Sequence, residues 1–327
     1  MSGSDKDEQT TGRQPSKAAR LFDRGQAEPV PAAAGPVAGG ASELLELSGQ
    51  VRPEDVRRER RWAPSWWHLV LIPLAVLMIF PFFWLVVTSL QTLEQSHTAG
   101  LHFALQGHNY VDALRQSPFI RWFLNTTFVS VTVVISNLAF CSLAGYALAR
   151  IRFFGNGALF LVILATLMVP FQVVMVPTLL IVRSLGLVDT LPALMAPNFV
   201  TPFGVFLLRQ FFKTMPVEIE EAARIDGAGR LGTLFKVVLP SMRAPLATVG
   251  IMTLLWTWND FLWPLIAIQS EKNYTLQLGL MTFQGAHNIN WPLVMAATVM
   301  TQIPMLVIFV FAQRWFVRSL ATQGIKG

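Results

Sequence analysis

Six apolar stretches, each close to the length of a membrane-crossing helix, are the feature that most constrains this chain. They lie at about residues 67–90, 122–149, 158–182, 190–211, 244–268 and 292–314. A helix needs roughly 20 apolar residues to cross a ~30 Å hydrocarbon core, and only helices or closed barrels satisfy every backbone polar group there. The fourth stretch is the least regular, because Pro192, Pro197 and Pro202 interrupt it. The pattern predicts an all-α polytopic membrane protein with about six transmembrane helices.

The charge content agrees with a bilayer as the solvent. Only 13% of the 327 residues are charged, against roughly 25% in average soluble domains. The formal net charge is +6, but the basic residues flank the apolar stretches and do not gather on one solvated face. This placement favours anionic lipid headgroups over nucleic acid as the counterpart. The lone Cys141 excludes an internal disulfide.

The distribution of Lys and Arg predicts the orientation in the membrane. With the N-terminus inside, the inner segments hold sixteen Lys and Arg residues near the apolar stretches, and the outer loops hold four. Because positive residues are retained on the cytoplasmic side, we expect both termini in the cytoplasm. Residues 1–62 are rich in Pro, Ala, Gly and Ser and are expected to form a disordered cytoplasmic tail. Residues 63–327 would form the transmembrane domain.

A polar segment at about residues 214–242 interrupts the apolar C-terminal part of the chain. Pro216 suits the first helical position, and Glu218 and its acidic neighbours would then lie in the first turns, where the positive end of the helix dipole favours them. Ala222 and Ala223 give this helix a slim side, which would let it enter a cleft of another protein with carboxylates on its flanks.

A turn is predicted after this helix at Gly227 and Gly229, because glycine readily adopts left-handed conformations. A second helical run is expected beyond the turn. Four of its apolar residues recur at one-face spacing, namely Leu231, Leu234, Phe235 and Val238. The segment therefore predicts two short helices at an angle to each other.

The residue order in this segment resembles the E-A-A loop of ABC importer permeases. The match consists of Glu221-Ala222-Ala223, then Gly227 after three further residues, and Leu239-Pro240 at the end. The resemblance implies a cytoplasmic loop whose short coupling helix docks into a groove of a separate ATPase subunit. It assigns the ATPase coupling to Glu218, Glu221, Ala222, Ala223, Asp226 and Gly227. The alternative is an ordinary amphipathic hairpin that only joins two membrane spans.

Motifs elsewhere in the chain are similar to those of the maltose-type branch of carbohydrate-importer permeases. They follow one another in the order of that branch: Asn109-Tyr110, Asn125-Thr126-Thr127, the run from Ala144 to Arg150, Met168-Val169-Pro170, Trp258-Asn259-Asp260-Phe261 and the run from Gly324 to Gly327. The resemblance covers about residue 67 to the C-terminus and implies the type I ABC importer permease fold. Ser319 and Gln323 depart from the pattern, which leaves a contact of the C-terminus with the ATPase open.

The resemblance also implies the partners of the chain. The chain would be one of two different permease subunits of an ATP-driven sugar importer in a bacterial plasma membrane. Its partners would be the second permease, a cytoplasmic ATPase dimer, an extracytoplasmic sugar-binding (lipo)protein and membrane lipid. No catalytic residue, cofactor or metal is expected, and the sequence has no phosphate-binding loop of its own. The sequence does not identify the sugar.

Trp258, Asn259 and Asp260 are the candidates for the translocation path. Asp260 is the only acidic residue well inside an apolar stretch. A charge at the centre of a membrane helix costs ~2.5–3.5 kcal/mol, so such a residue usually faces a cavity or a partner. Rings and amides of this kind suit a sugar. The alternative is that Asn259 and Asp260 cap a broken helix and Trp258 anchors the membrane interface.

Two other functions are compatible with a polytopic membrane protein. A stand-alone secondary carrier should contain paired ionisable residues or half-repeats across its spans. An intramembrane enzyme requires convergent catalytic groups at membrane depth. Beyond Asp260 neither pattern is evident in the sequence, so an ATP-driven importer subunit is the main prediction.

Overall fold

The computed structural model describes residues 66–321 except 99, 101–103 and 285–288. The predicted tail over residues 1–62, the terminal motif and Gln323 lie outside the described residues. The chain divides into two units, Met1–Leu69 and Val70–Gly327. Only the beginning of one helix represents the first unit among the described residues, so the features below belong to the second.

The regular secondary structure of the described residues consists of helices joined by turns and loops, with one isolated bridge between Gln284 and Ile289. The longer helices in chain order are α3 (Trp67–Ser89), α5 (His108–Gln116), α6 (Phe119–Arg150), α7 (Asn156–Leu167), α8 (Phe171–Ser184), α10 (Pro202–Thr214), α11 (Val217–Ile225), α14 (Arg243–Trp258) and α17 (Trp291–Ala321). The shorter helices are α4 (Leu93–Ser96), α9 (Leu191–Met195), α12 (Arg230–Thr233), α13 (Leu239–Ser241), α15 (Leu262–Ala267) and α16 (Leu276–Leu280). The all-α prediction is confirmed.

Four to six of these elements can cross a membrane. Four helical segments among the described residues are long and apolar enough alone: Trp67–Ser89, Phe119–Arg150, Leu191–Thr214 and Trp291–Phe311. Two more spans arise only if a bent pair is counted as one. These pairs are α7 with α8, bent by 104°, and the Arg230–Ser241 segment with α14, bent by 84°. The predicted number of about six is therefore the upper end of the observed range.

Two predicted spans differ from the observed helices. The predicted 158–182 span is broken between α7 and α8, where Pro170 has extended backbone angles. Proline lacks the N–H of a continuing helix and disfavours helical angles at the residue before it. The predicted 244–268 span ends at Trp258 and resumes as α15 at Leu262. This break places Pro264 in the first turn of α15, where its missing N–H leaves no helical bond unmade.

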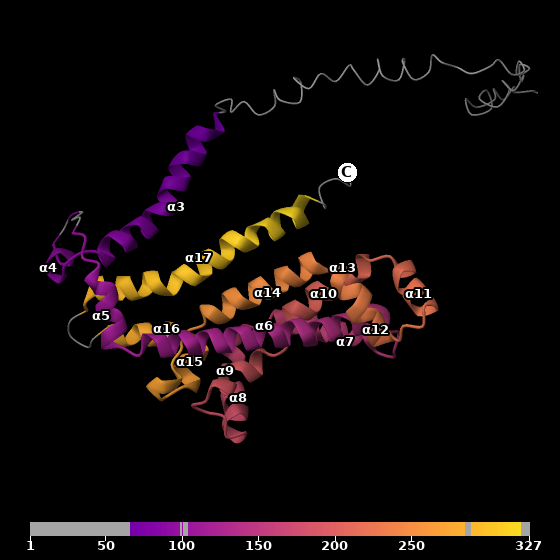
Figure 1. The fold of residues 1–327 in the computed structure, drawn as a ribbon. Coiled ribbons are helices and arrows are strands. Elements are labelled where there is room, and N and C mark those ends of the chain that lie inside the picture. Colours follow the sequence, from indigo (N-terminus) through magenta and orange to yellow (C-terminus); the bar gives the residue numbers. More distant parts are fainter. Residues whose placement is uncertain (1–65, 99, 101–103, 285–288, 322–327) are drawn as a thin grey trace, which may run out of the picture. The chain divides into compact units, whose positions relative to one another are not determined.

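α6 is the helix along which the second unit is assembled (Figure 1). α10 and α14 pack along it, and α9 and α16 also contact it. Two glycines allow this close packing. A Cβ atom at Gly145 would lie 3.1 Å from the backbone nitrogen of Arg209, and one at Gly204 would lie 2.8 Å from the Cys141 sulfur. Small residues at helix contacts are typical of membrane bundles, where packing rather than water exclusion holds helices together.

Polar side chains of α6 bind its neighbours at two levels. Near the middle of the helix, buried Asn137 donates to the Asn198 carbonyl at 2.6 Å and accepts from the Thr201 hydroxyl at 2.7 Å. Near its start, Asn125 donates to the Tyr274 carbonyl at 2.9 Å. Carbonyls at helix ends lack partners within the helix, so these amides satisfy backbone groups that would otherwise be unpaired.

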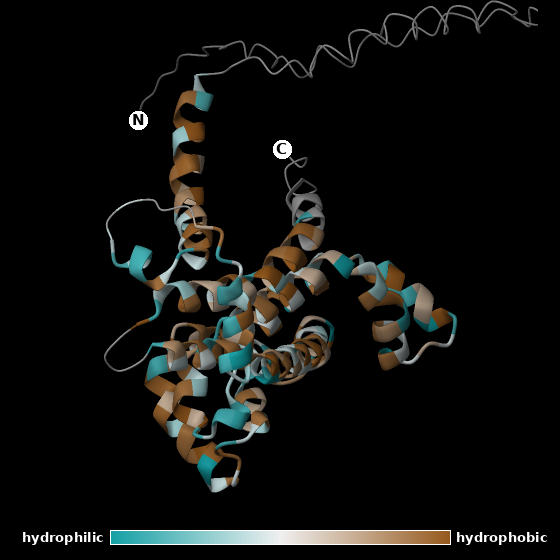
Figure 2. Cartoon of the chain, turned by 60° about the vertical axis from the view of Figure 1, so that its left-hand side comes forward, coloured by the Kyte–Doolittle hydropathy of each residue, from teal (hydrophilic) through white to brown (hydrophobic). Residues whose placement is uncertain are grey.

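α3 exposes most of its apolar surface. In its most apolar stretch of 18 residues, 6% of the residues are buried by the rest of the chain, compared with 39% in the corresponding stretch of α6. In Figure 2 most of α3 is drawn in the brown of hydrophobic residues. An uncovered apolar surface of this extent is typical of a helix that faces lipid or another membrane subunit.

Candidate functional site

The polar segment of residues 214–242 lies at the end of α6 opposite to α5 and α16 (Figure 1). Its first helix, α11, begins at Val217, and Pro216 is the residue before it rather than its first residue. Gly227 has a φ of 85°, and its neighbour Ala228 donates from its backbone to the Ala223 carbonyl at 2.9 Å. This left-handed helix ending confirms the predicted turn at Gly227.

The second half of the segment differs from its prediction in two details. Gly229 has a φ of −67° and precedes α12, so it is not left-handed. The run then continues through a π-helical turn, Leu234–Val238, into α13. Of the four residues predicted to share one face, Leu234 and Val238 are buried, whereas Leu231 is 63% exposed and Phe235 is 53% exposed. Because a π turn holds more residues than an α turn, the 3.6-residue spacing does not apply across it.

α11 has one face toward the chain and one face away from it. Glu220 and Ala223 are buried on the inner face. Of the predicted coupling residues only Ala223 is buried, and four of the others are exposed along the helix and its end: Glu218, Glu221, Ala222 and Asp226. Gly227 is exposed at the turn. The two alanines therefore face different surroundings, because Ala223 packs against this chain and Ala222 remains open to a partner.

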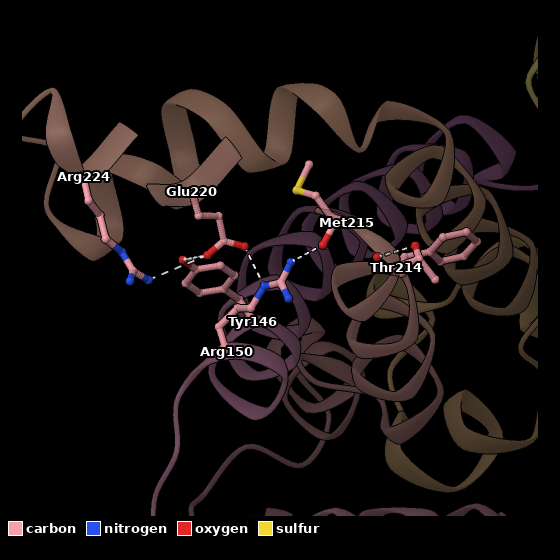
Figure 3. Close-up of polar contacts among 7 residues, drawn as sticks. Tyr146, Arg150, Thr214, Met215, Glu220 and Arg224 are labelled. Atoms are coloured by element: carbon pink, nitrogen blue, oxygen red, sulfur yellow. Dashed lines mark hydrogen bonds and ion pairs between the residues drawn. The ribbon is translucent and has the colours of Figure 1, made fainter. Parts of the chain in front are cut away.

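A buried carboxylate attaches α11 to the end of α6 (Figure 3). The Glu220 side chain is 1% exposed, and it accepts from the Arg150 Nε at 2.6 Å and from the Tyr146 hydroxyl at 2.9 Å. Arg224, one turn further along α11, has a nitrogen 3.9 Å from the same carboxylate. Arg150 also donates to the Met215 carbonyl at 2.6 Å. A carboxylate with this many partners is held in one position, since a buried charge needs both pairing and hydrogen bonds.

Sequence reasoning missed Glu220, Tyr146 and Arg150 as a functional group. Tyr146 and Arg150 are four residues apart and so share one face of α6. That spacing was a usable signal, as was the position of Arg150 at the end of an apolar stretch. Their carboxylate partner lies 70 and 74 residues further along the chain. No local pattern connects residues so far apart.

A second candidate site is a cavity of about 500 Å³ at the break between α14 and α15. Asn259 and Asp260 line it, together with Trp256 and with Asn198 from the neighbouring broken segment. The Asp260 carboxylate also lies 3.4 Å from the backbone nitrogen of Trp263, near the start of α15. Both interpretations of Asp260 thus have a geometric basis, since one carboxylate borders the cavity and the helix start.

Trp258 is separate from this cavity. It is 4% exposed, packs in an apolar cluster, and donates from its indole nitrogen to the Thr301 carbonyl at 3.2 Å. The ring beside the cavity belongs to Trp256, which is 54% exposed. Trp256 and Trp258 are two positions apart on α14, so their side chains point about 200° apart around the helix axis. Only one of these tryptophans therefore borders the cavity.

The described residues contain no group of three or more His, Cys, Asp or Glu placed to hold a metal ion. Their ion pairs join Arg150 to Glu220, Arg224 to Glu220, and His108 to Asp112. The arrangement is suited to holding and moving helices.

The helical fold, with the polar helix α11 attached to α6 through Glu220, defines a class of protein: a helical membrane subunit of a transport assembly. The chain belongs to the family of binding-protein-dependent transport system inner membrane components, which it matches over residues 142–322. It is therefore a permease subunit of an ABC importer in the inner membrane. It is not an enzyme, because ATP hydrolysis belongs to a separate subunit in this family. The family match confirms the predicted resemblance to ABC importer permeases and the predicted function class. It does not support the carrier and enzyme alternatives.

Several curated relatives are permease subunits of sugar transport systems. The chain is 40% identical over 206 residues to the arabinooligosaccharides transport system permease protein AraQ of Halalkalibacterium halodurans, covering 63% of this chain and 74% of the relative. It is 30% identical to AraQ of Bacillus subtilis, covering 79% and 94%. It is 31% identical to the lactose transport system permease protein LacG of Rhizobium radiobacter, covering 77% and 93%.

A solved structure has the same fold. It is a crystal structure of a bacterial ABC transporter involved in the import of the acidic polysaccharide alginate. One of its chains superimposes with a TM-score of 0.70 at 22% sequence identity, covering 86% of this chain and 100% of that chain. The predicted importer permease fold is thereby confirmed.

Proposed function

We propose that this chain forms, with a second permease subunit, the translocation path for a sugar or sugar-like solute, and that α11 is the helix that couples the path to a cytoplasmic ATPase dimer. The observation that carries the proposal is the attachment of an exposed polar helix to the central helix α6 through buried Glu220. An element held in this way transmits a displacement as a rigid body. A hairpin that merely joined two spans would not need a buried charge.

The orientation follows from the positive residues. We place both termini, the residue 1–62 tail and the 214–242 segment in the cytoplasm, where an ATPase can reach α11. The binding-protein-dependent family supports an extracytoplasmic partner on the other side, and an alginate importer has been crystallised with its pentasaccharide-bound periplasmic protein. The lipid-facing surface of α3 is the proposed membrane contact.

The outward face of α11 has the chemistry of a docking surface. Glu218 and Glu221 flank Ala222, which leaves room for a partner's backbone to approach. Ile225 follows on the same face and is 86% exposed. An exposed large aliphatic side chain beside carboxylates is the composition expected of a helix that inserts into a groove and is oriented by charge.

A path of direct contacts leads from α11 to the cavity. Glu220 holds α11 to the end of α6. In the middle of α6, Asn137 donates to the Asn198 carbonyl at 2.6 Å, and Asn198 lines the cavity beside Asp260. A shift of α11 would therefore move a helix that is bonded to the cavity wall. We propose Asn259 and Asp260 as solute contacts of this chain, with specificity shared with the second permease and the binding protein.

Sugar transport as the solute class is supported by the relatives. AraQ and LacG are named for arabinooligosaccharides and lactose. A further relative, the permease protein UgpE of Yersinia pestis, is named for sn-glycerol-3-phosphate and is 30% identical. The proposed solute is accordingly a small polyhydroxylated molecule.

The coupling role is tested by two loop variants in the purified complex. Glu221→Lys reverses a charge on the exposed face, and Gly227→Pro demands a negative φ where the chain has 85°. We expect both to abolish solute-stimulated ATP turnover, with Glu221→Lys also weakening retention of the ATPase. Glu271→Lys is the matched control, because it makes the same charge reversal in a predicted outer loop. Full stimulation in both loop variants would contradict the coupling role.

A further inference from the structure

A basic cavity lies beside the attachment of α11. Its volume is about 520 Å³, and it is bordered by the end of α6, the connection to α7, the end of α10 and the inner face of α11. Its charged lining residues are Arg150, Arg152, Arg209, Lys213, Arg224 and Glu220. Five cations and one carboxylate give the lining a net charge of +4 when all are ionised. A concave surface with this excess concentrates anions.

The coupling attachment uses only part of this positive charge. Arg150 is paired with Glu220 at 2.6 Å, and Arg224 is 3.9 Å from the same carboxylate. Arg152 and Lys213 are exposed and make no hydrogen bond or ion pair within the part of the chain that the structure describes. Two full charges at the cavity are therefore unmatched among the described residues.

A third cation is fixed in place without being neutralised. Arg209 is 8% exposed, and its guanidinium lies 3.5 Å above the ring of Phe160 in α7. Its Nε donates to the Leu148 carbonyl at 3.3 Å. That bond leaves both terminal nitrogens of the guanidinium for a ligand in the cavity. A preorganised guanidinium recognises phosphate oxygens with two parallel donors.

We propose that this cavity binds the phosphate headgroup of an anionic phospholipid from the inner leaflet. The inference rests on the proposed cytoplasmic side of α11, because that orientation places the end of α6 at the inner membrane surface. Basic pockets between membrane helices on this side are suited to anionic headgroups. The bound headgroup would join α6, α7 and α10 at the base of the coupling helix.

The surroundings favour a lipid over free phosphate or an acidic protein segment. Phe153 and Phe154 follow Arg152 directly and are 42% and 106% exposed. Along α7, Leu159 and Val162 are 47% and 60% exposed. Apolar side chains next to the cations would contact acyl chains, whereas phosphate or a carboxylate would leave them in water. The juxtaposition of cations and bare apolar surface matches an amphipathic ligand.

Lipid retention by the complete importer tests the proposal. The probe is phosphatidylglycerol, counted by native mass spectrometry after purification, with phosphatidylcholine as the neutral comparison. Arg152→Gln and Lys213→Gln remove these two charges without breaking a side-chain hydrogen bond or ion pair among the described residues. We expect affinity for phosphatidylglycerol to fall about fivefold for each variant and about 25-fold for both together, since a basic residue near an anionic leaflet contributes ~1 kcal/mol. Phosphatidylcholine retention should not change.

Matched controls distinguish a lipid site in the cavity from a general electrostatic attraction of the protein for anionic lipid. Lys236→Gln and Arg230→Gln remove the same charge from exposed positions of the 214–242 segment outside the cavity. We expect them to retain phosphatidylglycerol as the parent protein does. An equal loss in the control pair would overturn the proposal, because it would indicate only net charge.

Two further outcomes would also overturn it. Displacement of the lipid by millimolar inorganic phosphate would identify a free anion as the ligand. Loss of the ATPase subunit from the Arg152→Gln, Lys213→Gln complex, with lipid unchanged, would identify an acidic segment of that subunit. Failure of the coupling role is distinguishable, because Glu221→Lys and Gly227→Pro would then leave ATP turnover intact whatever lipid is retained.

Discussion

Glu220→Gln removes the charge of the attachment while keeping the shape of the side chain. In the parent protein the 1% exposed carboxylate accepts from Arg150 at 2.6 Å and from Tyr146 at 2.9 Å. A hydrogen bond to a charged group contributes ~1.5–3 kcal/mol, and removing one partner of a buried ion pair costs ~3–5 kcal/mol. The amide can still accept one bond, and Arg150 keeps its bond to the Met215 carbonyl. We therefore expect the free energy of unfolding to fall by about 2–4 kcal/mol.

The loss is measured by sodium dodecyl sulfate unfolding titrations of the permease in mild detergent. Glu221→Gln is the matched control, because the next residue carries the same charge but is exposed and has no ion pair among the described residues. Its effect should stay within ~0.5 kcal/mol. A double-mutant cycle with Arg150→Gln then isolates the pair. We expect a coupling energy of about 2 kcal/mol, because the second substitution removes a charge already left without its partner.

The same variant distinguishes the attachment of α11 to α6 from the binding of the ATPase subunit to α11. If α11 acts through α6, Glu220→Gln should lower the ratio of solute transported to ATP hydrolysed while the ATPase stays bound to the exposed face of α11. A coupling energy within ~0.5 kcal/mol of zero would refute the reasoning about the pair. A normal transport ratio in a variant destabilised as expected would refute its role in transmission.

Three further predictions concern other parts of the chain. Asp260→Ala should reduce uptake of labelled sugar about tenfold, the effect of losing a bond or two to the solute, while subunit assembly is unchanged; normal uptake would remove Asp260 from the path. Asp189 accepts from the Ser270 hydroxyl and from the Ser270 and Gln269 backbone nitrogens, and these bonds lower its pKa to about 2. Because the unfolded pKa is ~3.9, this carboxylate should stabilise the fold fully above about pH 4 and progressively less toward pH 2. Thermal unfolding of Asp189→Asn should lack that dependence, and a parallel acid limb in the variant would contradict the assignment. Gly279→Ala should cost about 1–3 kcal/mol in the same unfolding titration, since its Cβ would lie 2.3 Å from the buried Trp122 ring; an unchanged stability would mean that the ring moves freely.

The sequence predicted those features that depend on local composition and spacing. Long apolar stretches predicted a helical membrane protein because a hydrocarbon solvent leaves the backbone few alternatives. Gly227 predicted the end of α11 because a left-handed angle is inexpensive only for glycine. The motif around Glu221 indicated the importer family, which the match over residues 142–322 confirmed.

The breaks in the spans were only partly predictable. Pro170 and Pro264 were visible in the sequence, but proline in a membrane helix produces either a mild kink or a full break. The 104° bend between α7 and α8 depends on what the neighbouring helices provide for the freed backbone groups. Likewise, the choice of Trp256 rather than Trp258 for the cavity depends on where α14 packs against its neighbours.

The 214–242 segment shows most clearly which features the sequence predicts and which depend on tertiary contacts. By itself the sequence predicted a polar segment at residues 214–242 with a short acidic helix at its start, and α11 is that helix. At 100° per residue, Glu218, Glu220 and Glu221 lie within about 160° of one another on the same side of the helix, so no periodicity distinguishes the inward carboxylate from the two exposed ones. Only the tertiary structure decided that Glu220 is buried, because Arg150 and Tyr146 at the end of α6 supply the charge and donors that burial requires. A charged side chain is buried where a partner compensates its charge, and the partner of Glu220, Arg150, lies 70 residues away in the sequence.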